Sequence, residues 1–239
     1  MSLLELQNVS KSYGDGEVTV HALVRIDLSI DSGHLIAVMG PSGSGKSTLL
    51  TIAGGLEEPT SGDVLIDGAS LSSMSRNDKA RLRRRRIGFV FQDYNLLSGL
   101  TAVENVSLPL ELDGVAMRKA RNAGMAALAE LGLTERAGHY PGQLSGGERQ
   151  RVSIARAVVG ERHLLLADEP SGALDSTNGE AVMQLIRDAC KRGVAAVVVT
   201  HDAHLAEFAD RVVFLRDGHV VDQATQPSAD YLLDASTRQ

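Results

Sequence analysis

Residues 40–48, which read GPSGSGKST, have the composition of a phosphate-binding loop. The glycines allow backbone dihedral angles that side chains forbid, so several N–H groups can point at one anion. Lys46 can supply a positive charge to β- and γ-phosphates, and Ser47 can offer a hydroxyl to Mg²⁺. Thr48 falls in the first turn of a predicted helix, where free N–H groups favour an anion. We therefore expect a nucleotide to contact Gly40, Ser42, Gly43, Ser44, Gly45, Lys46, Ser47 and Thr48.

Two adjacent acids, Asp168 and Glu169, follow the apolar run at 164–167. An acid at the end of such a strand holds Mg²⁺, usually through water, in enzymes with a phosphate-binding loop. Because adjacent side chains leave a strand in different directions, Asp168 can serve the metal while Glu169 orients and polarises the attacking water. His201 follows the apolar run at 195–200 and has two interpretations, a contact to the γ-phosphate or an ordinary surface histidine.

A second anion-binding pattern occurs at residues 144–148, which read LSGGE and precede a helical run. Ser145, Gly146 and Gly147 would place a hydroxyl and free N–H groups at the start of that helix. One nucleotide does not need two such cradles from one chain. We therefore predict that the second cradle faces a neighbour's nucleotide, in a head-to-tail dimer with ATP between the subunits.

The elements that must position these residues follow from the hydrophobic pattern. Residues 35–39 (LIAVM) read as a buried strand before the loop, and residues 3–39 as a whole predict a small sheet that leads into it. Further strands are predicted at 62–68, 87–92, 164–167, 195–200, and in a terminal hairpin of 212–215 and 220–221 around Asp217-Gly218. Helices are predicted at 178–191 and 202–208. The alternation is typical of a parallel sheet with ligands at its carboxyl edge.

Residues 103–133 are alanine-rich, with apolar residues at three- and four-residue spacing. Helices without strands predict a separate helical lobe, at about 93–160, inserted into the α/β body.

Composition excludes several classes of protein. The chain has 239 residues and 43% hydrophobic composition, which suits one large domain or two closely joined ones. It has no run of about 18 apolar residues and no export signal at its start, so we expect a cytosolic location. The net charge of −6 argues against nonspecific nucleic-acid binding. Cys190 is the only cysteine and is expected in the core.

Two local features stay open at this stage. Tyr13, in the turn after the first predicted strand, is either a platform for a base or a plain surface tyrosine. Arg81 and the run Arg83 to Arg86 favour a solvated helix end over a contact with lipid headgroups or a partner.

Five motifs occur in order along the chain: GPSGSGKST, FQDYNLL at 91–97, LSGGERQRVSIARA at 144–157, LLLADEPSGALD at 164–175 and VVVTHD at 197–202. With them the chain resembles an ATP-binding-cassette (ABC) ATPase over nearly its whole length. The resemblance implies an α/β P-loop NTPase fold of the ABC type, with a mixed, mainly parallel sheet, an N-terminal antiparallel β subdomain and an inserted α-helical subdomain. It also implies one ABC ATPase domain over 1–239, divided into a core of 1–92 and 161–239 and a helical signature subdomain of 93–160.

The resemblance further implies roles for single residues. Tyr13 would stack on adenine, Lys46 would bind the β- and γ-phosphates, and Glu169 would be the catalytic base, with His201 as the γ-phosphate sensor. Ser47 and Gln92 would ligate Mg²⁺, with Asp168 behind water. The contacts to ATP in the opposite subunit would come from Ser145, Gly146, Gly147 and Asp175.

Within the family, GFVFQDYNLLSGLTAVENVSLPLEL and QLSGGERQRVSIARA resemble the lipoprotein-release and macrolide-export branch. This implies a homodimeric ATPase on the inner face of the membrane that drives a separate permease with a large extracytoplasmic domain, and in some systems a periplasmic adaptor. The exported or extracted substrate would be a lipoprotein, peptide or drug. The alternative is a non-transporting complex that controls cell-wall hydrolases through its permease. A soluble cassette of DNA repair or translation is disfavoured because the chain lacks sustained heptads and carries each motif once.

Overall fold

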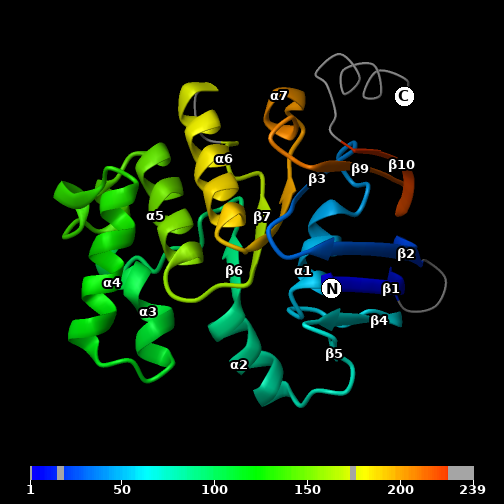
Figure 1. Cartoon of the computed structure of the whole chain (residues 1–239), viewed down its shortest axis with the longest axis horizontal. Coiled ribbons are helices and arrows are strands. Elements are labelled where there is room, and N and C mark those ends of the chain that lie inside the picture. Colours follow the sequence, from blue (N-terminus) through cyan, green and yellow to red (C-terminus); the bar gives the residue numbers. More distant parts are fainter. Residues whose placement is uncertain (1, 15–18, 173–175, 226–239) are drawn as a thin grey trace.

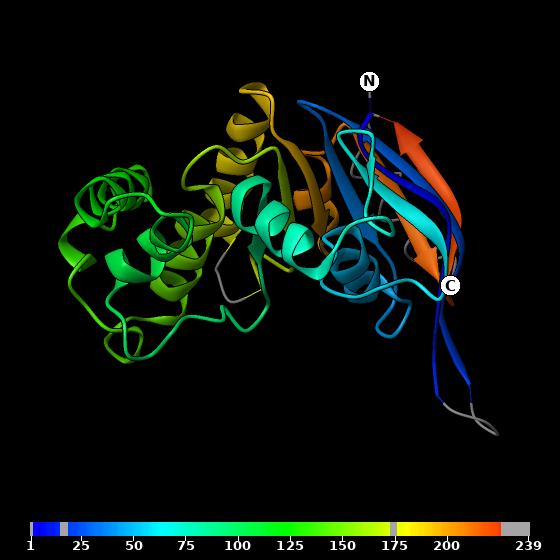
Figure 2. The ribbon, with the colours of Figure 1, turned by 90° about the horizontal axis from the view of Figure 1, so that it is seen from below.

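The structure is a computed structural model that describes residues 2–14, 19–172 and 176–225. Helices occupy one end of the molecule and antiparallel strands the other, with a mainly parallel sheet between them (Figure 1). A view turned by 90° shows the same separation (Figure 2).

The central sheet has six strands in the order β10-β9-β3-β8-β7-β6. Its strands are β3 (Leu35–Met39), β6 (Ile87–Val90), β7 (Leu164–Asp168), β8 (Ala195–Val199), β9 (Arg211–Arg216) and β10 (His219–Thr225). All pairs are parallel except the terminal hairpin of β9 and β10. The hairpin turns at Asp217 and Gly218, which both have positive φ, as the Asp-Gly pair predicts. Every residue of β3 and β8 is buried, which is typical of parallel strands covered on both faces.

A second sheet has four antiparallel strands in the order β2-β1-β4-β5. They are β1 (Ser2–Tyr13), β2 (Val20–Asp31), β4 (Ser61–Ile66) and β5 (Ala69–Ser70). The prediction of one small sheet over 3–39 is right for β1 and β2 but wrong for residues 35–39, which lie in the other sheet. Buried and exposed residues alternate along β2, whereas β3 is buried throughout, and this difference decides which sheet each strand joins.

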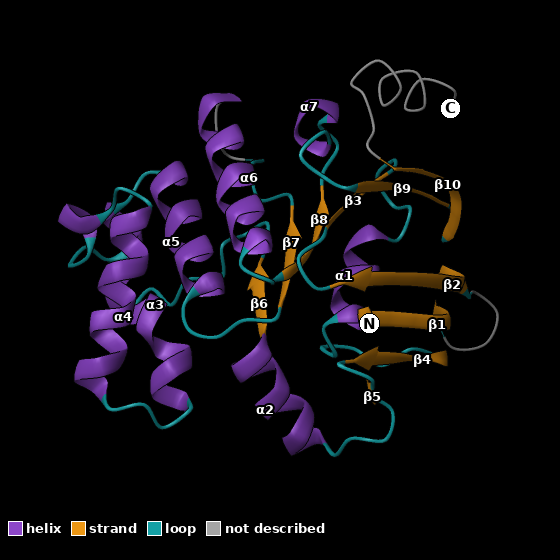
Figure 3. Ribbon diagram, in the orientation of Figure 1, coloured by secondary structure: helices purple, strands orange, loops and turns teal. Residues whose placement is uncertain are grey.

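Between β6 and β7 the chain forms helices and no strand, and these helices make up the helical end. It is formed by α3 (Ala102–Leu112), α4 (Met117–Glu130), α5 (Gly146–Val158) and two short 3₁₀ turns, η1 (Thr134–Arg136) and η2 (Pro141–Gln143). Figure 3 shows these helices grouped apart from the strands. The predicted helical stretch at 103–133 is divided by a turn at Asp113 and Gly114, where Gly114 has a φ of 88°.

The remaining helices flank the sheets. They are α1 (Lys46–Ala53), α2 (Arg76–Arg86), α6 (Ser176–Lys191) and α7 (Ala203–Ala206). Helix α2 ends in the arginine run, so the predicted helix end is present, but only part of it is solvated. Arg84 and Arg85 both pair with Asp113, and Arg83 donates to the carbonyl of Gly55 at 2.7 Å. The run therefore ties α2 to its neighbours.

Two apolar clusters cover the two faces of the six-stranded sheet. Along β3, Ile36 and Val38 belong to the cluster shared with α1 and the four-stranded sheet. Leu35, Ala37 and Met39 belong to a cluster that continues without a break through α6, α7 and the helices α3, α4 and α5. The helical end is thus built onto the same core as one face of the sheet.

Cys190 lies in this second cluster with 1% of its surface exposed, as predicted for a core residue. Burial raises the pKa of its thiol to about 12.

Over the described ranges, no helix combines the length and the apolar character that a membrane crossing requires.

Candidate functional site

The carboxyl ends of four adjacent strands, β3, β8, β7 and β6, bring most of the predicted site residues together. The phosphate-binding loop follows β3, His201 follows β8, Asp168 ends β7, and Gln92 follows β6. They surround a cavity of about 440 Å³. Its lining consists of Val20, His21, Ala22, Gly40, Ser42, Gly43, Gly45, Lys46, Ser47, Thr48, Gln92, Asp168, Glu169, Val199 and His201.

At two positions of the phosphate-binding loop, no residue larger than glycine fits. A Cβ on Gly40 would lie 2.0 Å from the carbonyl oxygen of Leu215, and one on Gly45 would lie 2.2 Å from that of Ala22. Both glycines have positive φ, 148° and 103°. The packing of the loop against neighbouring backbone therefore requires the absence of side chains here.

Helix α1 starts directly at the cavity. Its N-cap is Gly45, so no side chain caps the first N–H groups, and Lys46, Ser47 and Thr48 of the first turn line the cavity. Uncapped N–H groups at a helix start, with the positive end of the helix dipole, bind anions. Ser44 is predicted to contact nucleotide, but it is buried outside the cavity lining, and its hydroxyl has no hydrogen-bond partner.

Lys46 is folded back onto the loop. Its Nζ donates to the carbonyl oxygens of Gly40 and Pro41, each at 2.8 Å. Burial lowers the pKa of this ammonium, and the nearby carboxylates of Glu169 and Asp168 act in the opposite direction. The lysine is therefore a partly buried cation that shares the cavity with the two acids.

Glu169 and His201 form a pair across two strand ends. His201 Nδ1 lies 2.9 Å from Glu169 Oε1 and 3.0 Å from Oε2. The side chain of Glu169 is 15% exposed, whereas that of His201 is 76% exposed. Glu169 also has a φ of 49°, and its N–H donates to the carbonyl of Val199 at 3.0 Å. Non-glycine residues in this left-handed region occur preferentially at functional sites, where the surrounding structure holds them.

The same cavity collects the oxygen atoms that suit Mg²⁺. The hydroxyl of Ser47 on α1, the amide of Gln92 in the turn after β6 and the carboxylate of Asp168 at the end of β7 all line it. Mg²⁺ prefers one or two carboxylates together with water and phosphate oxygens. A glycine-rich loop at a helix start beside this donor set fits a magnesium-bound nucleoside triphosphate.

The second predicted cradle lies at the start of α5 and does not line this cavity. Ser145 is the N-cap, and its hydroxyl accepts from the N–H of Glu148 at 3.2 Å. Glu148 accepts in turn from the N–H of Ser145 at 2.8 Å and pairs with Arg136. These contacts, first the bond from the Ser145 backbone and then that from Arg136, lower the pKa of Glu148 to about 2. Gly146 and Gly147 follow in the first turn and are partly exposed.

Of the remaining predicted residues, Tyr13 falls outside the cavity lining. Tyr13 is the last residue of β1 and not part of a turn; it pairs with Val20, which lines the cavity. Its hydroxyl donates to Glu57 at 2.7 Å, and Lys11 lies over its ring. Burial, followed by the bond to Glu57, raises its pKa. Asp175 lies outside the described residues.

Sequence reasoning missed part of the lining and one set of supporting contacts. Val20, His21 and Ala22 reach the cavity through the register of β1 and β2, which no local pattern reveals. Arg156, on the last turns of α5, donates to the carbonyls of Tyr94 and Asn95 just beyond Gln92. The motif FQDYNLL at 91–97 contains Tyr94 and Asn95, but its spacing gives no sign of a partner about sixty positions away.

Comparisons with known proteins agree with this geometry. A family model described as ABC transporter matches residues 23–172. The macrolide export ATP-binding/permease protein MacB of Marinobacter nauticus is 46% identical over 229 residues, which cover 95% of this chain and 36% of that protein. MacB of Rhodopseudomonas palustris is also 46% identical, over 100% of this chain and 37% of its own length. The chain thus spans about a third of the length of these curated relatives.

Solved structures give a second comparison. The ATP-binding cassette MJ0796, in a dimeric post-hydrolysis state bound to ADP and Pi, superposes with a TM-score of 0.89. It is 42% identical and covers 94% of this chain and 99% of its own. A second dimeric structure of MJ0796, described as a bacterial ABC transporter cassette, matches to the same extent.

Proposed function

The chain belongs to the ABC transporter family, as the match over residues 23–172 shows, and from this premise we propose that it hydrolyses Mg·ATP to drive a membrane permease. The observation that carries the proposal is the convergence of Lys46, Asp168, Glu169 and His201 on one cavity at the carboxyl edge of the sheet. The family and the fold are those of an ATP-hydrolysing cassette.

Each residue of the cavity has a role in this proposal. The uncapped start of α1 and Lys46 bind the phosphates, with Lys46 exchanging its two carbonyl contacts for phosphate oxygens. Ser47 and Gln92 would hold Mg²⁺, with Asp168 behind water, and the ion would supply positive charge beside the phosphate oxygens. Glu169 takes a proton from the attacking water, and His201 holds that carboxylate in place and contacts the γ-phosphate.

We propose a head-to-tail homodimer as the active form. At the start of α5, Ser145 is exposed and Gly146 and Gly147 are partly exposed, and none of the three lines the chain's own cavity, so they are available to the nucleotide of a second copy. The dimeric cassettes of MJ0796 support this arrangement by similarity. Asp175 and Tyr13 remain assigned to ATP by the family resemblance alone.

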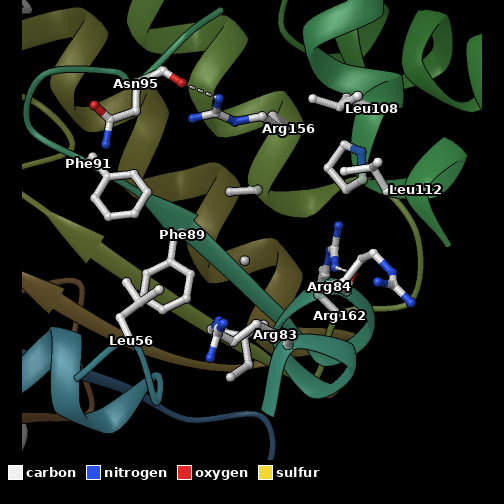
Figure 4. A pocket seen from close by; sticks show the side chains of 15 residues that line it. Leu56, Arg83, Arg84, Phe89, Phe91, Asn95, Leu108, Leu112, Arg156 and Arg162 are labelled. Atoms are coloured by element: carbon white, nitrogen blue, oxygen red, sulfur yellow. Dashed lines mark hydrogen bonds between the residues drawn. The ribbon is translucent and has the colours of Figure 1, made fainter. Parts of the chain in front are cut away.

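The proposed partner is an integral-membrane permease, which would hold the ATPase at the inner, cytoplasmic face of the membrane. In the relatives named ATP-binding/permease proteins, the segment that is 46% identical to this chain makes up about a third of the length, which supports such a partner. A cavity of about 450 Å³ between α2, β6, α3 and α5 offers a docking place (Figure 4). Export is favoured over cell-wall control because these relatives are export proteins by name. The large extracytoplasmic domain, the adaptor and the substrate class of lipoprotein, peptide or drug are parts of this proposal.

The test compares two substitutions in the purified chain. Lys46→Ala should weaken ATP binding at least ~10-fold, because a charge-assisted contact to phosphate is lost. Glu169→Gln should bind ATP normally but hydrolyse it about 10²-fold or more slowly, the scale of a lost general base. Binding is measured by fluorescent-nucleotide titration and turnover by phosphate release. Normal turnover in Glu169→Gln would show that the base is a different residue, and normal binding in Lys46→Ala would remove the proposed phosphate site.

A further inference from the structure

The segment that follows Gln92 has an unusual backbone. Tyr94 and Asn95 are consecutive non-glycine residues with positive φ, 60° and 47°. Tight hydrogen bonds close the turn, from Tyr94 N–H to the carbonyl of Phe91 at 3.1 Å and from Asn95 N–H to that of Asp93 at 2.6 Å. A backbone of this kind persists only where neighbouring groups hold it.

One side chain of α5 holds this turn. Arg156 Nη1 donates to the carbonyl of Asn95 at 2.5 Å, and Nη2 donates to the carbonyl of Tyr94 at 2.7 Å. Figure 4 shows the guanidinium reaching from α5 to the backbone at Asn95. A planar guanidinium that grips two successive carbonyls fixes both position and orientation, which a lysine cannot do.

A second residue of the same helix reinforces the contact. The guanidinium of Arg149 lies 5.4 Å from the centroid of the Tyr94 ring. Positions 149 and 156 are seven residues apart, so they lie on one face of the helix. The tyrosine hydroxyl also approaches Gly146, in the first turn of α5: a Cβ at Gly146 would lie 3.5 Å from it. One face of α5, from its first turn to its last, therefore contacts the turn that follows Gln92.

The turn is directly connected to the nucleotide cavity. Gln92 lines that cavity two positions before Tyr94, and Phe91, which accepts the hydrogen bond from Tyr94 N–H, is its immediate neighbour. Holding the carbonyls of Tyr94 and Asn95 thus restricts the backbone from which the Gln92 amide projects.

We propose that Arg156 is a positioning residue for Gln92, which keeps its amide oxygen in place for Mg²⁺ and links that ligand to the orientation of α5. The role of Gln92 toward Mg²⁺ rests on the proposed function; the restraint of the turn by Arg156 does not. A merely structural arginine would stabilise α5 without any selective effect on the metal.

The first experiment measures the Mg²⁺ concentration for half-maximal ATP hydrolysis in wild type, Arg156→Ala, Gln92→Ala and the double variant. Loss of a residue that supports a metal ligand typically weakens metal affinity about 10-fold or more. We therefore expect Arg156→Ala to raise the required Mg²⁺ by about 10-fold, and to have no further effect once Gln92 is alanine. Equal factors in the two backgrounds would overturn the proposal.

Arg118→Ala is the matched control, since Arg118 is an exposed residue of α4 at the same end of the molecule. It should leave the Mg²⁺ requirement unchanged. Arg156→Lys, which keeps the charge, should need an Mg²⁺ concentration between those of wild type and Arg156→Ala. It replaces the alanine variant if that variant does not fold.

The second experiment does not depend on activity. Hydrogen exchange of peptides that span residues 92–97, measured without nucleotide, should be about 10-fold faster in Arg156→Ala than in wild type or Arg118→Ala, because local opening becomes easier. Unchanged exchange in this segment would overturn the proposal even if hydrolysis were slowed. A wild-type chain that does not hydrolyse ATP would contradict the proposed function, while the exchange result would still decide the role of Arg156.

Discussion

Single residues at the nucleotide cavity differ in how far the fold constrains them. Glu169 is largely covered, has a left-handed backbone and receives its hydrogen bond from the exposed His201. A covered carboxylate next to an exposed imidazole suits a base that must stay in place while its partner contacts an incoming phosphate. The two residues therefore differ in how freely they can move. The backbone of Glu169 is fixed by its neighbours, whereas the ring of His201 is open to solvent.

Cys190 allows a simple check of the core at the same scale. Its thiol is 1% exposed, and burial raises its pKa to about 12. At pH 8 only about 10⁻⁴ of such a thiol is ionised, and the thiolate is the reactive form. We expect the folded chain to react with an aromatic disulfide reagent at least ~10³-fold more slowly than the unfolded chain.

The unfolded chain should release one equivalent of chromophore, because the sequence holds one cysteine. Rapid reaction of the folded protein would show that this side of α6 opens easily or is packed differently.

Among the elements, α5 depends most clearly on one charged cap. Glu148 accepts from the Ser145 N–H and pairs with Arg136, and its pKa falls to about 2 from an ordinary value of 4.5. Since the pKa is lower in the folded state, the contribution of this carboxylate is fully present above pH 4.5. It declines as the pH falls from 4.5 and is lost below about pH 2.

Glu148→Gln should consequently lower the free energy of unfolding by about 1 kcal/mol at pH 7, the usual scale of a helix cap. The difference from wild type should shrink at pH 3. Urea unfolding followed by circular dichroism at the two pH values measures it, and Glu130→Gln, at an exposed position of α4, serves as the control. A constant difference between pH 7 and pH 3 would contradict the assigned charge effect.

How far the sequence predicts these elements depends on whether the signal is local. The buried runs at 35–39, 164–167 and 195–200, and the Asp217-Gly218 turn, are predictable because their hydrophobic pattern and turn chemistry lie within a few residues. The assignment of residues 35–39 to the other sheet is not predictable, because strand pairing is not local. The sequence indicates helix α2 only through its arginines, because the helix has few apolar residues and its contacts, such as Arg84 with Asp113, join distant segments.

The site shows the same limit. Lys46, Asp168, Glu169 and His201 could be named from motifs, and their meeting at one edge follows from the rule for parallel strands. The hydrogen bonds from Arg156 to the turn after Gln92 cannot be predicted from the sequence, because they depend on how α5 packs against β6. Only the packed structure brings a guanidinium from position 156 to carbonyls at 94 and 95.

For the whole molecule, the separation of the two cradles leads to a prediction about assembly. In the proposed head-to-tail dimer, the start of α5, which does not line the chain's own cavity, completes the nucleotide site of the second copy. Glu169→Gln with Mg·ATP should therefore double its mass in static light scattering, and return to the monomer mass with Mg·ADP.

The double variant Lys46→Ala, Glu169→Gln should stay monomeric with Mg·ATP, because it lacks the proposed phosphate contact. A mass that is the same with and without nucleotide would argue against ATP as the bridge between subunits.

The apolar cluster that runs without a break from the helices α3, α4 and α5 to one face of the sheet has a mechanical consequence. Protein interiors are packed as densely as organic crystals and transmit strain. A shift of α3, α4 or α5 therefore requires repacking of the side chains that these helices share with the sheet. Force applied at the helices is expected to reach the strand ends through this shared layer.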